Sequence, residues 1–340
     1  MKICIYGAGA IGGYVGLMLS KGGADVSLIA RGAHLEAIRR NGIAVDFKDG
    51  RQTAKVTATD DPAELGPQDY VIVALKAHQA WEAADRMAPL LSPETAVVTM
   101  QNGIPWWYFH GFEGQYAGLQ LQSVDPGSRQ WIAIGPHRAI GATVYPATEI
   151  TEPGVIRHIY GDRFGFGEPD RSESWRARRL VSAFEAGGLK ARLYPDIRND
   201  IWLKLWGNLC FNPISALTHA TLDVVATDPG TRAVARHMME EAEKIARRIG
   251  VHFRVDIERR INGAAGVGAH RTSMLQDLDR GRAIELDALL GVVQELGRIV
   301  DVETPHIDTV LALARQMGRV KGVYPVFPED EPEEEEMNVD

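Results

Sequence analysis

The chain has few cysteines and no long apolar run, and each shortage excludes a class of protein. Among its 340 residues only Cys4 and Cys210 are cysteines, too few for a disulfide framework, so we expect buried, reduced thiols in a cytoplasmic protein. No segment approaches the roughly 18 uninterrupted apolar residues that a membrane-spanning helix requires, so no membrane partner is expected. The first strand is interrupted by glycines, which is not the pattern of a signal peptide.

Positive charge is not in surplus either. The net charge is −8 at pH 7, but the segment 327–340 alone holds eight acidic side chains and no Lys or Arg. The rest of the chain has 37 acidic and 37 basic residues, so it offers no basic field for a nucleic acid. The acidic tail has nothing to bury, and we expect it to be flexible. No nucleic-acid partner and no metal site are predicted.

A glycine-rich turn follows the first strand. The apolar residues 3–5 run into Gly-x-Gly-x-x-Gly, and the residues expected to hold a dinucleotide here are Gly7, Ala8, Gly9, Ala10, Ile11 and Gly12. Gly7 makes the tight turn, Gly9 lets the backbone approach a pyrophosphate, and Gly12 packs the next helix on the strand. The N-terminus of that helix adds free N–H groups and a positive dipole end. With its flanking strand and helix, the motif predicts a dinucleotide-binding fold.

The second strand, 25–30, ends without the acidic residue that usually holds the ribose 2′-hydroxyl of NAD. Arg31 stands at that position. A carboxylate would repel a 2′-phosphate, whereas a guanidinium binds it with paired, charge-assisted hydrogen bonds. The alternative is that Arg31 is an ordinary solvated cation. We favour the first interpretation and predict NADP(H) as the cofactor.

Strands and helices alternate over the first part of the chain, which predicts a doubly wound sheet. The apolar runs 70–75 and 96–100 are typical of parallel strands covered on both faces. We also expect a hairpin-like pair, 43–47 with 55–58, and added antiparallel strands at 139–145, 154–158 and 163–166.

From Pro195 onwards the pattern becomes helical. Helices are expected at 201–217, 229–249, 282–300 and 305–317. We therefore predict an α/β protein with a Rossmann-type sheet domain at 1–195, an all-helical substrate domain at 196–326 and the acidic tail at 327–340. A small substrate would meet the nicotinamide in the cleft between the two domains.

Polar residues stand where a ligand would bind. Lys76 and Asn102 follow the strands 70–75 and 96–100, at the sheet edge where open α/β folds hold ligands, although each could simply cap a loop. Lys204, Asn208 and Asn212 are spaced by four and share one face of an otherwise apolar helix. Such a polar stripe is costly unless it lines a site. A third element offers a hydroxyl and carboxylates at the start of a helix: Ser273, Asp277 and Glu285.

Together these residues resemble the ketopantoate reductase (2-dehydropantoate 2-reductase) family. The matching pieces, in family order, are Gly7-x-Gly9-x-x-Gly12, Arg31, Leu75-Lys76, Asn102-Gly103, Lys204-x-x-x-Asn208-x-x-x-Asn212-Pro213 and Ser273-Met-Leu-Gln-Asp277 with Glu285. The resemblance implies NADPH-dependent reduction of ketopantoate to pantoate in pantothenate biosynthesis. It also implies that Lys204 donates the proton and Glu285 assists it. Asn208, Asn212 and Ser273 would hold the substrate, while the glycines, Arg31, Lys76 and Asn102 would contact NADPH.

The chemistry agrees with these roles. A 2-oxo acid that accepts hydride at C2 needs an acid within hydrogen-bond reach of its keto oxygen. A lysine ammonium can polarise that carbonyl and donate the proton, and a nearby carboxylate fixes its position and charge. Helical second domains in this group often pair, so a homodimer is a possible assembly.

Two departures leave other interpretations open. His270 stands where the family often has a substrate-contacting asparagine, and the segment after Asn102 holds four aromatic residues in a row, 106–109. Most of these aromatics are expected in the core, with one or two near the cleft. A bulkier branched or aromatic 2-oxo acid is therefore an alternative substrate. A second alternative is a non-catalytic NADP(H)-sensing protein, but a sensor would need neither Lys204 nor Glu285.

Overall fold

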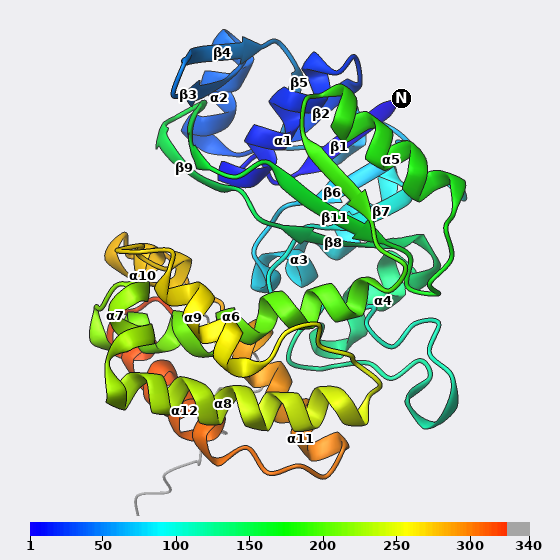
Figure 1. The fold of residues 1–340 in the computed structure, drawn as a ribbon. Coiled ribbons are helices and arrows are strands. Elements are labelled where there is room, and N and C mark those ends of the chain that lie inside the picture. The colour runs from blue at the N-terminus through cyan, green and yellow to red at the C-terminus, as the bar shows by residue number, and fades with distance from the viewer. Residues whose placement is uncertain (325–340) are drawn as a thin grey trace, which may run out of the picture.

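The computed structural model describes residues 1–324, so the acidic tail predicted at 327–340 lies outside the described residues. Figure 1 shows a sheet-containing part above a layer of helices. The N-terminal part begins with β1 (Lys2–Tyr6), α1 (Ala10–Lys21), β2 (Asp25–Ile29) and α2 (Gly32–Asn41). None of the helices in these 324 residues is both long and apolar enough to span a bilayer.

An eight-stranded sheet forms the core of the N-terminal part. Its strand order is β12-β11-β8-β7-β6-β1-β2-β5, with β1 near the middle and the chain winding outwards in both directions from it. The remaining strands are β5 (Thr57–Thr59), β6 (Tyr70–Val73), β7 (Ala96–Thr99), β8 (Ala139–Val144), β11 (Arg163–Gly167) and β12 (Lys190–Leu193). All neighbouring pairs are parallel except β11 with β8. The predicted Rossmann-type α/β class is confirmed.

The predicted pairing of the segment 43–47 with 55–58 is wrong. β3 (Ile43–Phe47) pairs antiparallel with β4 (Gly50–Ala54), and the segment predicted as its partner instead contributes β5 to the main sheet. Gly50 has a φ of +133°, which lets the chain turn back immediately after β3. β3 and β4 join β9 (Ala147–Glu152) and β10 (Val155–Tyr160) in a separate four-stranded sheet.

The strand β8 was expected to be an added antiparallel strand, but it runs parallel to β7. The long connection 100–138 carries the chain back to the start of the sheet, as a parallel crossover requires. It contains short helical pieces, among them α4 (Arg129–Ala133), and the whole aromatic run. Trp106, Trp107, Tyr108 and Phe109 are 0–2% exposed. All four belong to the core, so the expectation that one or two lie near the cleft is wrong.

Helices make up most of the C-terminal part. The long α6 (Ile197–Thr218) runs through its centre and buries Trp202 and Trp206 completely. Around it lie α7 (Leu222–Thr227), α8 (Pro229–Arg248), α9 (Ile257–Ala265), α10 (Ser273–Asp279), α11 (Val292–Ile299) and α12 (Pro305–Val320). The helical class of this part was predicted correctly, while the short α7 and α9 were not anticipated.

The helix predicted at 282–300 begins later than expected. A π-helical turn, Asp287–Gly291, precedes α11, and residues 282–286 form a segment without regular secondary structure, here called the strap. The strap makes its hydrogen bonds with other elements: the N–H of Ile284 donates to Val323 O at 2.8 Å, and the Ala283 carbonyl accepts from Lys76. Because these bonds replace those of a helical turn, Glu285 lies on the strap and not on a helix.

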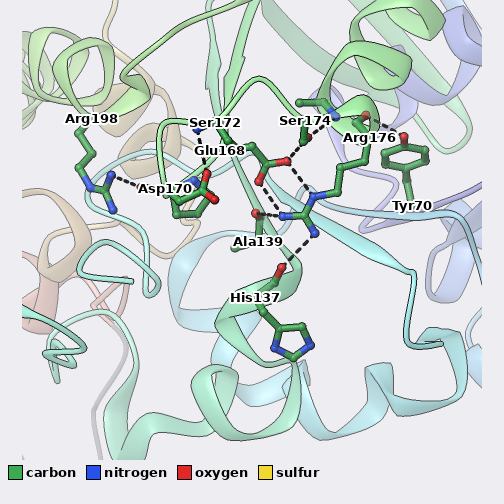
Figure 2. A network of polar contacts seen from close by, with 11 residues as sticks. Tyr70, His137, Ala139, Glu168, Asp170, Ser172, Ser174, Arg176 and Arg198 are labelled. Atoms are coloured by element: carbon green, nitrogen blue, oxygen red, sulfur yellow. Dashed lines mark hydrogen bonds and ion pairs between the residues drawn. The ribbon is translucent and has the colours of Figure 1, made fainter. Parts of the chain in front are cut away.

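An ion pair with a buried carboxylate connects the end of β11 to the helix that follows it. Arg176, in α5 (Trp175–Ala186), binds Glu168 through two hydrogen bonds of 2.8 and 2.6 Å (Figure 2). The same guanidinium donates to the carbonyls of His137 and Ala139 at the start of β8. Since Glu168 is only 3% exposed, every charge in this network is matched by a partner. The network holds one end of the sheet and does not reach the cleft described below.

A second buried arginine fastens the aromatic segment. Arg198, in α6, is 2% exposed and donates to the carbonyls of Tyr108, His110 and Pro169 at 2.9, 2.7 and 2.5 Å. Its guanidinium also lies 4.6 Å from the ring centroid of Phe112. The first turn of α6 is thus tied to two loops of the N-terminal part.

Candidate active site

A cleft of about 690 Å³ lies along the carboxyl ends of the parallel strands and is bordered on its other side by α10 and the strap. Most of the predicted site residues line it. These are Gly7, Ala8, Gly9, Ala10, Ile11, Arg31, Lys76, Asn102, Ser273 and Glu285. The structure therefore brings together residues from both halves of the chain at the sheet edge where ligands of open α/β folds bind.

The glycine turn has the shape that a dinucleotide requires. Gly7 has a φ of +106°, and a Cβ on Gly12 would stand 2.0 Å from the Gly7 carbonyl oxygen. A Cβ on Gly9 would meet no atom within 4 Å, so this position faces open space, where a phosphate can approach the backbone. His34 supports the turn because its Nε2 lies 2.7 Å from Ala8 O, while its Nδ1 accepts from the N–H of Gly154. The cradle fits the pyrophosphate of a nicotinamide dinucleotide.

Arg31 stands at the N-cap of α2, exposed, at one end of the cleft. Another arginine that sequence reasoning missed, Arg86, lines the same end and donates to the carbonyl of Asp60 at 2.9 Å. Both guanidinium groups lie close enough to Tyr6 to lower the pKa of its phenol, although burial raises that pKa more strongly. Arg86 comes from an irregular helical segment, and no local motif marks it.

Lys76 connects the two halves of the cleft. Its ammonium lies 2.9 Å from Asp277 Oδ2 in α10 and donates to the carbonyl of Ala283 in the strap. The next residue, Ala77, donates its N–H to Glu285 Oε1 at 3.0 Å. On the neighbouring loop, a Cβ at Gly103 would lie 1.9 Å from the Ala288 carbonyl oxygen. These contacts hold the strap and the π-helical turn after it against the ends of β6 and β7.

Lys204 extends from α6 toward Asn102, which lines the cleft. Its half-buried ammonium donates to Asn102 Oδ1 at 2.8 Å, and this bond joins the helical part to the end of β7. Burial lowers the pKa of Lys204 to about 8, and the charge of Glu285 opposes that shift. A single hydrogen bond to Asn102 leaves further N–H donors of the ammonium for a substrate oxygen. The arrangement is that of a positioned general acid.

Glu285 is close enough to Lys204 for its charge to act on the pKa of the lysine. Within residues 1–324, however, the two side chains form no hydrogen bond with each other. Its carboxylate accepts from Ala77 N, and burial raises its pKa. The Ala77 amide and the charges of Lys76 and Lys204 act in the opposite direction, while Asp277 adds to the rise. Glu285 therefore influences Lys204 through its charge, and Asn102 is the group that fixes the position of the ammonium.

The predicted substrate residues are not all in the same place. Ser273 begins α10 at the cleft, and Asn208 and Asn212 follow Lys204 along α6, half-buried and buried respectively. The ring of His270 instead packs edge-on against Tyr160 at 5.8 Å and is not among the residues that line the cleft. The geometry gives no support to the predicted substrate contact of His270. Within residues 1–324, no group of His, Cys, Asp and Glu side chains could hold a metal ion.

A dinucleotide cradle on a parallel sheet, facing a half-buried lysine from a helical domain, defines a two-domain NAD(P)-binding oxidoreductase. Comparison with known proteins places the chain more closely. Residues 3–108 match the family model "Ketopantoate reductase PanE/ApbA", and residues 196–318 match "Ketopantoate reductase PanE/ApbA C terminal". The chain belongs to the ketopantoate reductase family.

Individual relatives agree with the family models over nearly the whole chain. A 2-dehydropantoate 2-reductase of Mesorhizobium japonicum is 55% identical over 326 residues, which cover 95% of this chain and all of that protein. The crystal structure of a candidate ketopantoate reductase from Ralstonia solanacearum superposes with a TM-score of 0.90 at 41% identity, covering 95% of this chain and 99% of the other. A D-mandelate dehydrogenase, solved with NADH and anilino(oxo)acetate, shares the fold at 21% identity, covering 95% of this chain and all of that one, with a TM-score of 0.81.

Proposed function

We propose that the protein reduces 2-dehydropantoate (ketopantoate) to pantoate with NADPH. The observation that supports this proposal is the hydrogen bond from the Lys204 ammonium to Asn102, a residue that lines the dinucleotide cleft. The similarity to 2-dehydropantoate 2-reductases supports the choice of substrate. Homodimeric assembly and a cytoplasmic location stay predictions.

Each of the site residues would have a separate role in the reaction. NADPH, when bound, supplies a hydride to C2 of the 2-oxo acid. The glycine turn and Arg31 would hold its phosphates, and Asn102 would orient both the nicotinamide ribose and the Lys204 ammonium. Lys204 would polarise the keto oxygen and then donate a proton to it. Glu285 would favour the charged form of Lys204, and Asn208, Asn212 and Ser273 would hydrogen-bond the remainder of the substrate.

The proposal is tested by following NADPH oxidation with ketopantoate and with a panel of other 2-oxo acids. We expect ketopantoate to give the highest kcat/KM, because the aromatic run that suggested a bulkier substrate is buried in the core. A markedly higher kcat/KM for a branched or aromatic 2-oxo acid would overturn the choice of substrate. Absence of turnover with the whole panel, despite NADPH binding, would favour the sensing protein.

Arg31→Ala should weaken NADPH binding by about 1–3 kcal/mol, or about 5- to 150-fold in Kd. The reason is the loss of charge-assisted bonds to the 2′-phosphate, so NADH affinity should barely change. Fluorescence titration of both cofactors measures the effect, and Arg40→Ala, an exposed change on the same helix, is the control. Equal affinity of the unmodified protein for NADPH and NADH would contradict the prediction.

The rate of reduction should fall as the pH rises through about 8, the pKa to which burial lowers Lys204 from its ordinary value of 10.5. Reduction consumes the proton of the ammonium, so the neutral amine that forms above this pKa cannot serve as the acid. The measurement is kcat/KM for NADPH-dependent reduction as a function of pH. In Lys204→Ala the residual activity should lack this decline; a decline that persisted unchanged would assign it to another group.

A further inference from the structure

A guanidinium group without an acidic partner lies beside the catalytic face of α6. Arg260 is the fourth residue of α9 and is half-buried. Its side chain makes no hydrogen bond, ion pair or ring contact with any residue of the described chain. Arg176, which is half-buried like Arg260, and Arg198, which is buried, both donate to several acceptors. Arg260 is therefore the exception among these three arginines, and a partly desolvated cation without an anion is costly.

Gly207 brings Arg260 against the helix that carries Lys204. A Cβ on Gly207 would stand 1.9 Å from one terminal nitrogen of Arg260 and 2.7 Å from its Cζ. The guanidinium thus rests directly on the backbone of α6, where any larger residue would displace it. Gly207 lies three residues after Lys204, so these two positions are neighbours on the surface of the helix.

Tyr145 connects the surroundings of the two cations. It follows the end of β8 in the sheet domain, and its ring centroid lies 6.0 Å from Lys204 Nζ. Burial lowers the pKa of Arg260, and Tyr145 is one of two groups, with Cys210, that oppose this fall. No carboxylate of the described chain acts on Arg260 in this way. Tyr145 thus lies beside Lys204 of α6 and is one of the two side chains that act on the pKa of Arg260 of α9.

We propose that Arg260 binds the carboxylate of the 2-oxo acid while Lys204 donates a proton to its keto oxygen. The proposal rests on the proposed function, since a 2-oxo acid carries an anionic group beside the carbonyl that is reduced. A guanidinium offers paired donors that match a carboxylate, whereas Asn208, Asn212 and Ser273 supply no charge. Binding of the substrate anion would provide the acceptor that Arg260 otherwise lacks. Arg260 would then select 2-oxo acids over neutral carbonyl compounds.

The test compares two substrates that differ only in charge, ketopantoate and its primary amide. Arg260→Ala should raise KM for the acid about 10- to 100-fold, because a charge-assisted bond is lost, while kcat/KM for the amide stays nearly unchanged. Arg260→Lys should recover part of the loss, and added guanidinium ion should partly restore Arg260→Ala. Arg259→Ala removes the preceding, exposed arginine of α9 and should leave both substrates unaffected.

Gly207→Ala provides a second, independent variant. The added methyl group displaces the guanidinium but keeps its charge in the protein, so the acid should lose kcat/KM selectively here as well. NADPH affinity and circular dichroism confirm that each variant is folded. Equal losses for acid and amide, or an unchanged KM for the acid in Arg260→Ala, would overturn the role of Arg260. Failure of the unmodified protein to reduce any 2-oxo acid would instead overturn the proposed function.

Discussion

Replacement of Lys204 by alanine is expected to lower kcat for the 2-oxo acid by about 10²–10⁴-fold, the usual contribution of a positioned general acid. The ammonium that donates to Asn102 is lost, and no other lysine side chain forms a hydrogen bond with this amide in the described chain. NADPH binding should be little changed, because the phosphate cradle lies on the sheet domain. Steady-state kinetics and fluorescence titration measure the two effects separately.

The partners of Lys204 sharpen this prediction. Glu285→Ala should also reduce turnover, and the double variant should lose less than the product of the two single losses, because interacting groups are not additive. Lys244→Ala, which removes an exposed lysine from α8, is the control. Reduction of the 2-oxo acid by Lys204→Ala at a nearly normal rate would show that α6 does not carry the proton donor.

Arg198→Ala should produce the largest loss of stability among the changes considered, about 3–5 kcal/mol in the free energy of unfolding. The guanidinium satisfies the carbonyls of Tyr108, His110 and Pro169, which would remain buried without a donor. The contact with the ring of Phe112 would be lost as well. Denaturant unfolding followed by tryptophan fluorescence gives the value.

The control is Arg178→Ala on α5, where an exposed arginine pairs with Glu173 at 2.6 Å. Exposed ion pairs contribute about 0–1 kcal/mol, so the midpoint of unfolding should move little. If Arg198→Ala were as stable as Arg178→Ala, the three carbonyls would have found other donors, and the aromatic segment would not depend on α6.

Local patterns predicted the parts of the fold that local forces determine. The strand, glycine turn and helix at the N-terminus were anticipated because apolar periodicity and the steric needs of Gly7 and Gly12 act within a few residues. The pairing of β3 was not, since the partner depends on where the chain turns, and Gly50 decides that. β8 was also misjudged, because its direction depends on the long crossover that precedes it.

In the candidate site, too, local sequence predicts some features and tertiary contacts determine the others. The spacing of Lys204, Asn208 and Asn212 is enough to predict that they share one helix face, and all three lie on α6. The apolar periodicity wrongly predicted a helix that includes Glu285. Glu285 lies on the strap instead, because the hydrogen bonds that hold this segment come from Ala77 and from other residues distant in sequence. Arg86 and Arg260 carry no motif, and only tertiary packing identifies them. Conversely, His270 stands where the family often has a substrate-contacting asparagine, but its ring packs against Tyr160.

The bond between Asn102 and Lys204 has a consequence for how the enzyme can be altered. Reduction adds a hydride and a proton to the substrate. The hydride would come from the cofactor on the sheet side, and the proton would come from the helical side. The spacing between the two transfers is then fixed where the halves touch, as at Gly103 and Ala288. Substitutions where the two halves touch, as at Gly103 and Ala288, can therefore slow the reaction while leaving every reactive group intact.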